Sequence, residues 1–143
     1  MSSAPAPGPS TAISCLVYRD ARGAIEWLCR VIGFERHQVY EGPDKTVAHA
    51  ELKLGGGMIM IGTVKDSDYG RLIRQPDEIG GAETQSVYVV VPDADAVHQR
   101  AVAAGAKVAL PLKTEDYGGR GCSFFDPEGH LWNVGTYDPW SSR

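Results

Sequence analysis

The chain repeats one local pattern at two places. Residues 16–33 read as a strand, an aspartate, an amphipathic helix and a glycine, and residues 89–105 repeat that order with almost the same spacing from aspartate to glycine. In each half a stretch of short strands follows the glycine. Such self-similarity is typical of two like units that pack against each other. The duplication therefore predicts a binding pocket between two modules, because pockets favour the interfaces of repeats.

The alternation of apolar and polar residues predicts the same element order in each half. Asp20 caps the first helix and Gly33 ends it, while Asp93 or Asp95 caps the second and Gly105 ends it. The strands are expected at residues 13–18, 34–40, 46–54, 58–62, 86–91, 107–112, 120–125 and 130–137. The order predicts an α+β fold of two tandem βαβββ modules.

The domain boundaries follow from this order. A single domain is expected over residues 12–137, with module 1 at about 12–62, a connecting loop at 63–84 and module 2 at about 85–137. The Pro-, Ala- and Ser-rich residues 1–11 are expected to form a flexible arm, and residues 138–143 a C-terminal tail. A connection as long as 63–84 is usually a linker or a functional lid.

Charge and composition exclude several classes of protein. The net charge of −4 argues against a nucleic-acid binder, which would carry a basic face. No apolar run approaches the ~20 residues of a membrane span, and the N-terminus lacks the apolar core of a secretory signal. Cys15, Cys29 and Cys122 are odd in number and widely spaced. They predict small buried hydrophobic residues in a cytoplasmic protein, not a disulfide framework.

The most specific motif lies near the C-terminus. Tyr-Gly-Gly-Arg at 117–120, followed by Asp-Pro-Glu-Gly-His-Leu-Trp at 126–132, resembles the signature of single-domain glyoxalase/bleomycin-resistance-like proteins. These belong to the vicinal oxygen chelate superfamily, with glyoxalase I and the extradiol dioxygenases, and the resemblance covers roughly residues 11–137. It implies a cup-shaped mixed sheet with helices on the convex face, a ligand in the cup, and homodimers that often share each cup between chains.

The resemblance also locates four metal-ligand positions. They fall on Ile13 (or Ser14 with a shift of one residue), Met60, Ser86 and Asn133. None of these side chains is a good ligand for a divalent metal. The resemblance therefore implies a metal-free member that needs no cofactor and binds an organic molecule directly, with a divalent metal only at a non-standard site.

Five residues are candidates for the pocket lining. Asn133 can donate and accept hydrogen bonds, Met60 offers an adaptable wall, and Tyr88 a ring and a hydroxyl. Arg120, the arginine of the signature, suits a carboxylate or phosphate, although an ion pair with a nearby acid is an equal alternative. Tyr117 lies at a turn, where contact with a ligand and plain exposure are equally expected.

His49 and Glu51 form the candidate acid–base pair. Residues two apart in a strand point the same way, and a carboxylate orients an imidazole. The alternative is a solvated polar pair, since sheets with one wet face alternate in this way. Both residues could also belong to a displaced metal site.

Three functions remain open on the sequence. The first is a protein that binds a small apolar or aromatic molecule without metal. The second is an enzyme, a glyoxalase-like lyase or a dioxygenase-type relative, that uses His49 and Glu51 or a non-standard metal site. The third is a non-catalytic interaction or sensor module.

Overall fold

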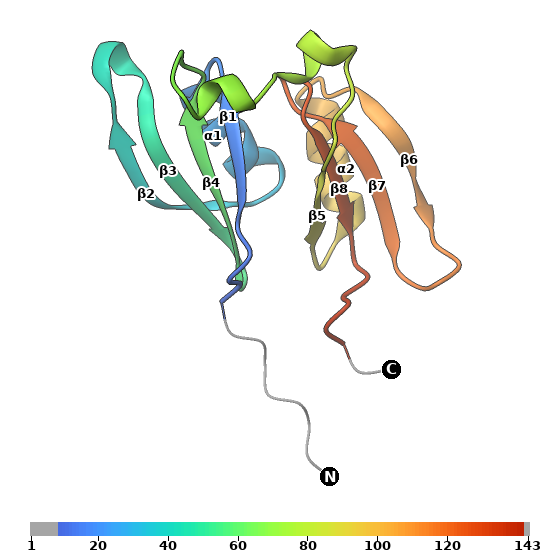
Figure 1. Ribbon diagram of the computed structural model, residues 1–143. Coiled ribbons are helices and arrows are strands. Elements are labelled where there is room, and N and C mark those ends of the chain that lie inside the picture. The colour runs from blue at the N-terminus through green and yellow to red at the C-terminus, as the bar shows by residue number, and fades with distance from the viewer. Residues whose placement is uncertain (1–8, 142–143) are drawn as a thin grey trace.

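The computed structural model describes residues 9–141 and confirms two βαβββ modules (Figure 1). Module 1 consists of β1 (Ser14–Tyr18), α1 (Ala21–Val31), β2 (Glu35–Glu41), β3 (Val47–Leu54) and β4 (Gly57–Thr63). Module 2 consists of β5 (Val87–Val90), α2 (Ala94–Ala103), β6 (Val108–Thr114), β7 (Arg120–Phe125) and β8 (Leu131–Gly135). Short 3₁₀ helices η1 (Pro43–Lys45), η2 (Gly70–Leu72) and η3 (Pro76–Ile79) lie in the connections.

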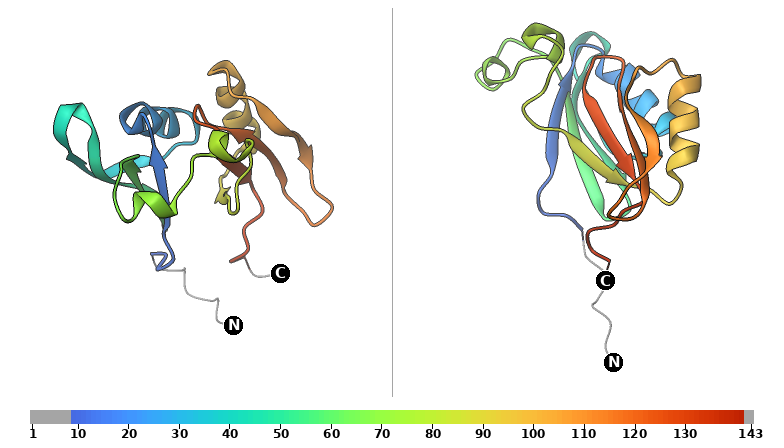
Figure 2. Two further views of the ribbon diagram at one scale, coloured as in Figure 1. Left: turned by 45° about the horizontal axis from the view of Figure 1, so that its top comes forward. Right: turned by 90° about the vertical axis from the view of Figure 1, so that its right-hand side faces the viewer.

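Each module forms its own four-stranded sheet. The strand orders are β1-β4-β3-β2 and β5-β8-β7-β6, with β1 parallel to β4, β5 parallel to β8 and the remaining pairs antiparallel. Both helices lie on the same side of the two sheets (Figure 2), so the opposite faces are left open. The predicted α+β class is confirmed, and its strands form two separate mixed sheets.

The predicted helix ends are confirmed. The Asp20 carboxylate accepts the Gly23 N–H at 3.0 Å, and the Asp93 carboxylate accepts the Ala96 N–H at the same distance. Asp93 and not Asp95 is therefore the cap of α2. Gly33 and Gly105 follow the helices with φ of 108° and 84°, a region that suits glycine because it has no Cβ.

One core joins the two modules. Trp27 of α1 packs edge-to-face on Phe124 of β7, with ring centroids 5.9 Å apart. Phe34 packs in the same way on Trp132 of β8, at 5.8 Å. Aromatic pairs of this geometry add to the free energy of simple burial. The helix of module 1 therefore covers part of the sheet of module 2.

The signature at 126–132 is a structural joint between the modules. The buried Asp126 accepts hydrogen bonds from the Tyr18 hydroxyl at 2.6 Å and from the Trp132 indole at 3.0 Å. Glu128 accepts the backbone N–H groups of Arg19 and Asp20. A buried carboxylate needs such partners, since an unpaired one is costly to bury.

The chain ends fall largely outside the described part of the structure. Residues 1–8 of the arm assigned to 1–11, and residues 142–143 of the assigned tail, lie outside it; the Ser10 N–H donates to the Gly56 carbonyl. Of the three free cysteines only Cys122 is buried; Cys29 is half-buried and Cys15 exposed, so the expectation of three buried thiols is wrong. No helix within residues 9–141 is long and apolar enough to cross a membrane.

Candidate functional site

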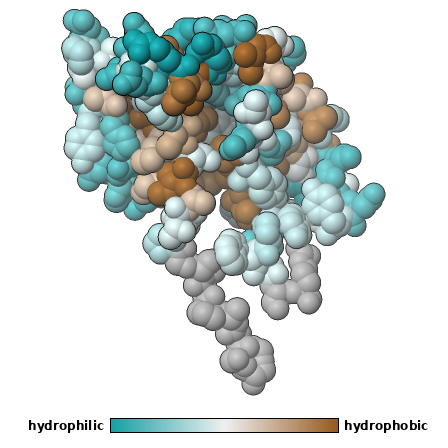
Figure 3. Space-filling view, in the orientation of Figure 1, coloured by the Kyte–Doolittle hydropathy of each residue, from teal (hydrophilic) through white to brown (hydrophobic). Residues whose placement is uncertain are grey.

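The open face of module 1 carries a cavity of about 540 Å³. Its floor comes from β1, β3 and β4, and its rim from the connecting segment between β4 and β5. The floor residues include Cys15, Val17, His49, Met60 and Gly62, and the rim residues include Val64, Tyr69, Ile73, Gln75 and Glu78. Figure 3 shows apolar surface over β1 and β4, below a hydrophilic upper edge.

The sheet register explains which residues face this cavity. Met60 pairs with Cys15 on one side and with Glu51 on the other, so all three point to the same face. Ser14 pairs with Ile59, which is buried against the helix side. Ser14, the alternative to Ile13 as the family's ligand position on this strand, therefore points to the other face from Met60, and neither Ile13 nor Ser14 lines the cavity.

His49 and Glu51 form a hydrogen-bonded pair beside the cavity. His49 Nε2 lies 2.9 Å from Glu51 Oε2, and the other Glu51 oxygen lies 4.0 Å from His37 Nε2. The His49 ring also stacks on Tyr40, with centroids 6.1 Å apart. The His49 ring is thus oriented from two sides while it lines the cavity, an arrangement that suits proton transfer to a bound molecule.

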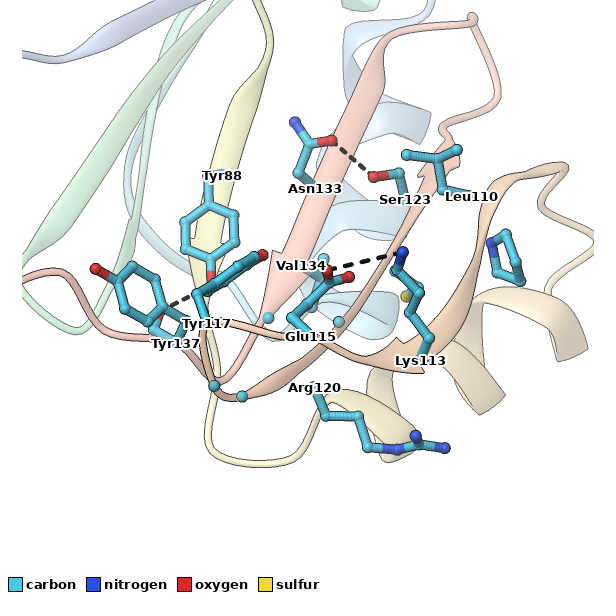
Figure 4. A pocket seen from close by; sticks show the side chains of 16 residues that line it. Tyr88, Leu110, Lys113, Glu115, Tyr117, Arg120, Ser123, Asn133, Val134 and Tyr137 are labelled. Carbon is cyan, nitrogen blue, oxygen red and sulfur yellow. Dashed lines mark hydrogen bonds and ion pairs between the residues drawn. The ribbon is translucent and has the colours of Figure 1, made fainter.

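Module 2 carries a second cavity of about 370 Å³ (Figure 4). Four of the predicted residues line it: Tyr88, Tyr117, Arg120 and Asn133. Sequence reasoning missed further lining residues, among them Leu110, Lys113, Glu115, Ser123 and Tyr137. Leu110 and Lys113 come from β6 and Ser123 from β7, while Tyr137 follows β8, so their meeting depends on how distant strands pair, for which the sequence gives no local signal.

Tyrosine rings fill one side of this second cavity. The Tyr88 hydroxyl donates to the Tyr137 carbonyl at 2.7 Å, and Tyr117 packs edge-to-face on Tyr137 with centroids 5.2 Å apart. Burial raises the pKa of Tyr88, and Tyr117, Asp138 and Tyr137 raise it further through charge repulsion. Tyr88 therefore stays a neutral hydrogen-bond donor at physiological pH.

Asn133 is held by protein groups on both ends of its amide. Its Oδ1 accepts from the Ser123 hydroxyl at 2.7 Å, and its Nδ2 donates to the Ser86 hydroxyl at 2.9 Å and to the Val87 carbonyl at 3.2 Å. Two of the four family ligand positions, Ser86 and Asn133, are thus joined by a hydrogen bond. This network fixes the amide as part of the cavity wall.

Arg120 forms the ion pair that was its alternative interpretation. Its Nε lies 2.7 Å from Asp95 Oδ1, and its Nη1 donates to the Thr114 hydroxyl at 3.3 Å. Figure 4 shows the guanidinium directed away from Tyr88 and Asn133. Because Asp93 caps α2, the Asp95 carboxylate is available to pair with Arg120. It occupies the guanidinium group that a ligand carboxylate or phosphate would otherwise bind.

The predicted site residues therefore divide between two cavities of one chain. His49 and Met60 line the cavity of module 1, with Glu51 behind His49, while Tyr88, Tyr117, Arg120 and Asn133 line that of module 2. The expected single pocket between the modules does not bring these residues together. The reason is packing: the modules meet through α1 and the joint at Asp126, and the hollows remain on the open faces.

The side chains do not fit the metal that the fold family implies. The family's ligand positions hold Ile13, Met60, Ser86 and Asn133. Within residues 9–141 no group of three or more His, Cys, Asp or Glu side chains is arranged to hold a metal ion. Divalent metals in proteins need such imidazole, thiolate or carboxylate donors.

Comparisons with known proteins agree on the family. Residues 11–134 match the Glyoxalase/Bleomycin resistance protein/Dioxygenase superfamily. The uncharacterized protein Rv0887c of Mycobacterium tuberculosis is 32% identical over 120 residues, which cover 84% of this chain and 70% of the relative. The uncharacterized protein Mb0911c of Mycobacterium bovis is also 32% identical, over 84% of this chain and 78% of its own length.

Solved structures show the same architecture. TioX from Micromonospora sp. ML1 superposes with a TM-score of 0.67 at 32% identity and covers 88% of this chain and 97% of its own. The fosfomycin resistance protein FosX from Mesorhizobium loti superposes with a TM-score of 0.61, covering 91% and 93%, but at 15% identity it is similar in fold alone. With its two βαβββ modules and its match over residues 11–134, the chain belongs to the Glyoxalase/Bleomycin resistance protein/Dioxygenase superfamily.

Proposed function

We propose that the protein binds a small, largely apolar organic molecule in the cavity of module 1 without a protein-held metal. The observation that carries this proposal is the cavity itself, about 540 Å³ with a floor of Cys15, Val17, Met60 and Gly62. Its volume lies within the roughly 300–1,000 Å³ of small-molecule sites. The residues at the family's metal positions are poor metal ligands, which supports direct contact between the protein and the bound molecule.

The same proposal includes a homodimer in the cytoplasm. In the family's shared cups one chain covers the open sheet face of the other, and here each module keeps an open face with a cavity. The strand β2, at the edge of its sheet, is exposed along its whole length, which leaves room for a partner. The free thiols Cys15, Cys29 and Cys122 support a reducing compartment.

Equilibrium dialysis against a library of apolar metabolites and antibiotics tests the binding. Gly62→Leu fills the cavity from its floor and is expected to weaken any hit at least ten-fold. The backbone tolerates a side chain there, because a Cβ at Gly62 would have only the Ala48 carbonyl within 4 Å, at 3.7 Å. The matched control is Ala103→Leu, which adds nearly as much bulk on the exposed surface of α2. A library without a single hit would overturn the proposal.

A second candidate is catalysis by His49 with Glu51. The 2.9 Å contact between the two side chains beside a cavity favours it. If the bound molecule is turned over, His49→Ala should abolish turnover while circular dichroism shows an intact fold. Glu51→Gln should lower the rate less, because it leaves the imidazole in place. An unchanged rate in His49→Ala would remove the proposed base.

A further inference from the structure

The two modules place equivalent residues around their cavities. Cys15 pairs with Met60 in module 1 as Tyr88 pairs with Asn133 in module 2. Two residues further along the same strands, on the same face, the pairs are Val17 with Gly62 and Val90 with Gly135. Cys15 and Tyr88 also lie equally far before the aspartates that cap α1 and α2. Cys15 is therefore the counterpart of Tyr88, and Gly62 that of Gly135.

The residues that follow each glycine correspond in sequence and share one side-chain contact. Gly62-Thr63-Val64 corresponds to Gly135-Thr136-Tyr137. The Thr63 hydroxyl accepts the N–H of Val47, the first residue of β3, at 3.1 Å. The Thr136 hydroxyl accepts the N–H of Arg120, the first residue of β7, at 2.9 Å. Val64 is therefore the counterpart of Tyr137 in sequence order, although the Val64 N–H continues the strand pairing to the Tyr18 carbonyl at 2.9 Å and the chain of module 2 bends at Thr136.

In module 2 the protein fills the space over the glycine with its own ring. A Cβ on Gly135 would lie 2.5 Å from the Tyr88 hydroxyl oxygen and 3.2 Å from two ring carbons. The hydroxyl of that ring donates to the Tyr137 carbonyl at 2.7 Å. Glycine is required at 135 because the phenol ring lies directly on it.

In module 1 the same space is open. Cys15 is too short to reach over Gly62, and a Cβ on Gly62 would meet only the Ala48 carbonyl at 3.7 Å. No side chain in contact explains the glycine, and Cys15, Gly62 and Val64 all line the cavity. Met60 belongs to the same floor, and sulfur–aromatic contacts are favourable.

We propose that the ligand of the module 1 cavity is a hydroxyaryl compound whose ring lies on Gly62, in the place that Tyr88 fills in module 2. The ring hydroxyl donates to the Val64 carbonyl, and His49 and Met60 border the ring. This inference rests on the proposed function, since it names the chemical class of the bound molecule.

The first test uses 4-methylphenol, the tyrosine side chain as a free molecule, in ligand-observed NMR. For so small a probe the expected dissociation constant is on the order of 1 mM. Toluene, which lacks the hydroxyl, should bind about five-fold more weakly, the value of one ordinary hydrogen bond. Equal binding of the two probes would overturn the role of the Val64 carbonyl.

Two reciprocal variants locate the ring. Cys15→Tyr should place a ring of the protein itself over Gly62 and abolish 4-methylphenol binding, while Cys15→Ser, which stays small, should keep it. Tyr88→Cys should open the space over Gly135 and raise the stoichiometry from one 4-methylphenol per chain to two. Binding that Cys15→Tyr leaves unchanged in a folded protein would overturn the inference.

The same experiments separate this inference from the proposed function. If 4-methylphenol fails to bind but Gly62→Leu still blocks a non-aromatic hit from the library, the hydroxyaryl class is wrong and the binding function stands. If neither the library nor 4-methylphenol binds, both fall. Because Tyr88→Cys predicts a gain of binding, a variant that merely misfolds cannot imitate that result.

Discussion

Modules 1 and 2 pair their strands in equivalent register, but they differ in the side chain that lies over the equivalent glycines Gly62 and Gly135. In module 2 the Tyr88 ring covers Gly135 and is fixed by the Tyr137 carbonyl. In module 1 Cys15 leaves Gly62 uncovered, and the larger of the two cavities results. One side chain at equivalent positions thus decides whether the glycine of the repeated fold is covered by a ring of the protein or left open.

The residues beside these glycines also differ between the two sheets. In module 2 Asn133 is held by Ser123 and Ser86 and serves the wall of its cavity. In module 1 the corresponding strand pair presents Met60 beside Glu51, and Glu51 orients His49. Polar groups in module 2 therefore satisfy one another, whereas module 1 combines an apolar floor with one oriented imidazole.

The largest expected effect tests whether the modules unfold separately. Trp132 is fully buried, contacts Phe34 of module 1 and donates to Asp126. Trp132→Ala should lower the free energy of unfolding by about 3–5 kcal/mol. Ile59 is the counterpart of Trp132 in the register of module 1. Ile59→Val should lower the free energy of unfolding by only about 0.5–1.5 kcal/mol.

Urea unfolding followed by circular dichroism and by tryptophan fluorescence checks this prediction. The two signals should coincide in both variants, because the aromatic contacts join the modules into one cooperative unit. Two separate transitions in Trp132→Ala would show that modules 1 and 2 unfold as independent domains.

A buried histidine of module 2, in contact with module 1 and with the connecting segment, gives the pH dependence. The buried His130 lies 3.3 Å from Glu83 and 3.1 Å from the Val17 carbonyl. Burial alone lowers the pKa of His130, but the hydrogen bond to Glu83 and the charges of Asp126 and Glu83 outweigh it, and the net pKa is raised. The charged form therefore stabilises the folded protein.

The sign of the effect follows from this shift. Stabilisation is complete below the unfolded pKa of about 6.5 and is lost as the pH rises through the higher folded value. Glu83→Gln should cost about 1.5–3 kcal/mol at pH 6 and less at pH 9. Thermal melts at both pH values measure it, with Asp77→Asn as a control on the exposed Arg19–Asp77 pair. An equal cost at both pH values would contradict the charged pair.

The glycine pair tests the comparison directly. Gly135→Ala should destabilise the protein by about 1 kcal/mol, since the new methyl group displaces the Tyr88 hydroxyl from its hydrogen bond. Gly62→Ala should be neutral or stabilise it by about 0.5 kcal/mol, because the site is open and alanine loses less backbone entropy. Chemical unfolding of both variants decides; equal costs would show that the two floors are equivalent.

The smallest effect concerns Arg120. Because its ion pair with Asp95 is largely exposed, Arg120→Ala should change stability by at most about 1 kcal/mol. Binding of an apolar ligand in module 1 should be unchanged. Dialysis of this variant against a library hit checks the point, and a large loss of affinity would place Arg120 at the ligand after all.

Much of the fold could be predicted from local patterns. The two aspartate caps, the glycines at the helix ends and the βαβββ order depend on contacts within a few residues, and the structure confirms them. Trp132 is buried and its neighbour Asn133 faces the cavity, as the two-residue period of a strand requires. The shared face of His49 and Glu51 likewise required only the two-residue period of a strand.

Less of the candidate site could be predicted, because it depends on contacts between residues far apart in the sequence. That Asp95 takes the Arg120 guanidinium depends on where α2 lies against the β6–β7 hairpin. The exposure of Cys15 at a cavity depends on which face of the β1–β4 pair packs against the helices. Comparison of the two repeats, Gly62-Thr63 with Gly135-Thr136, was a signal in the sequence that could have pointed to the floor residues.

The sequence by itself determined the duplicated fold, its helix ends and the non-ligand residues at the family's metal positions, because periodicity, capping and residue chemistry are local properties. The tertiary structure alone decided that the predicted site residues divide between two hollows, that Arg120 and Asn133 are bound by the protein, and that Gly62 lies uncovered. Those outcomes depend on how two sheets and two helices pack, and no short stretch of residues specifies that packing.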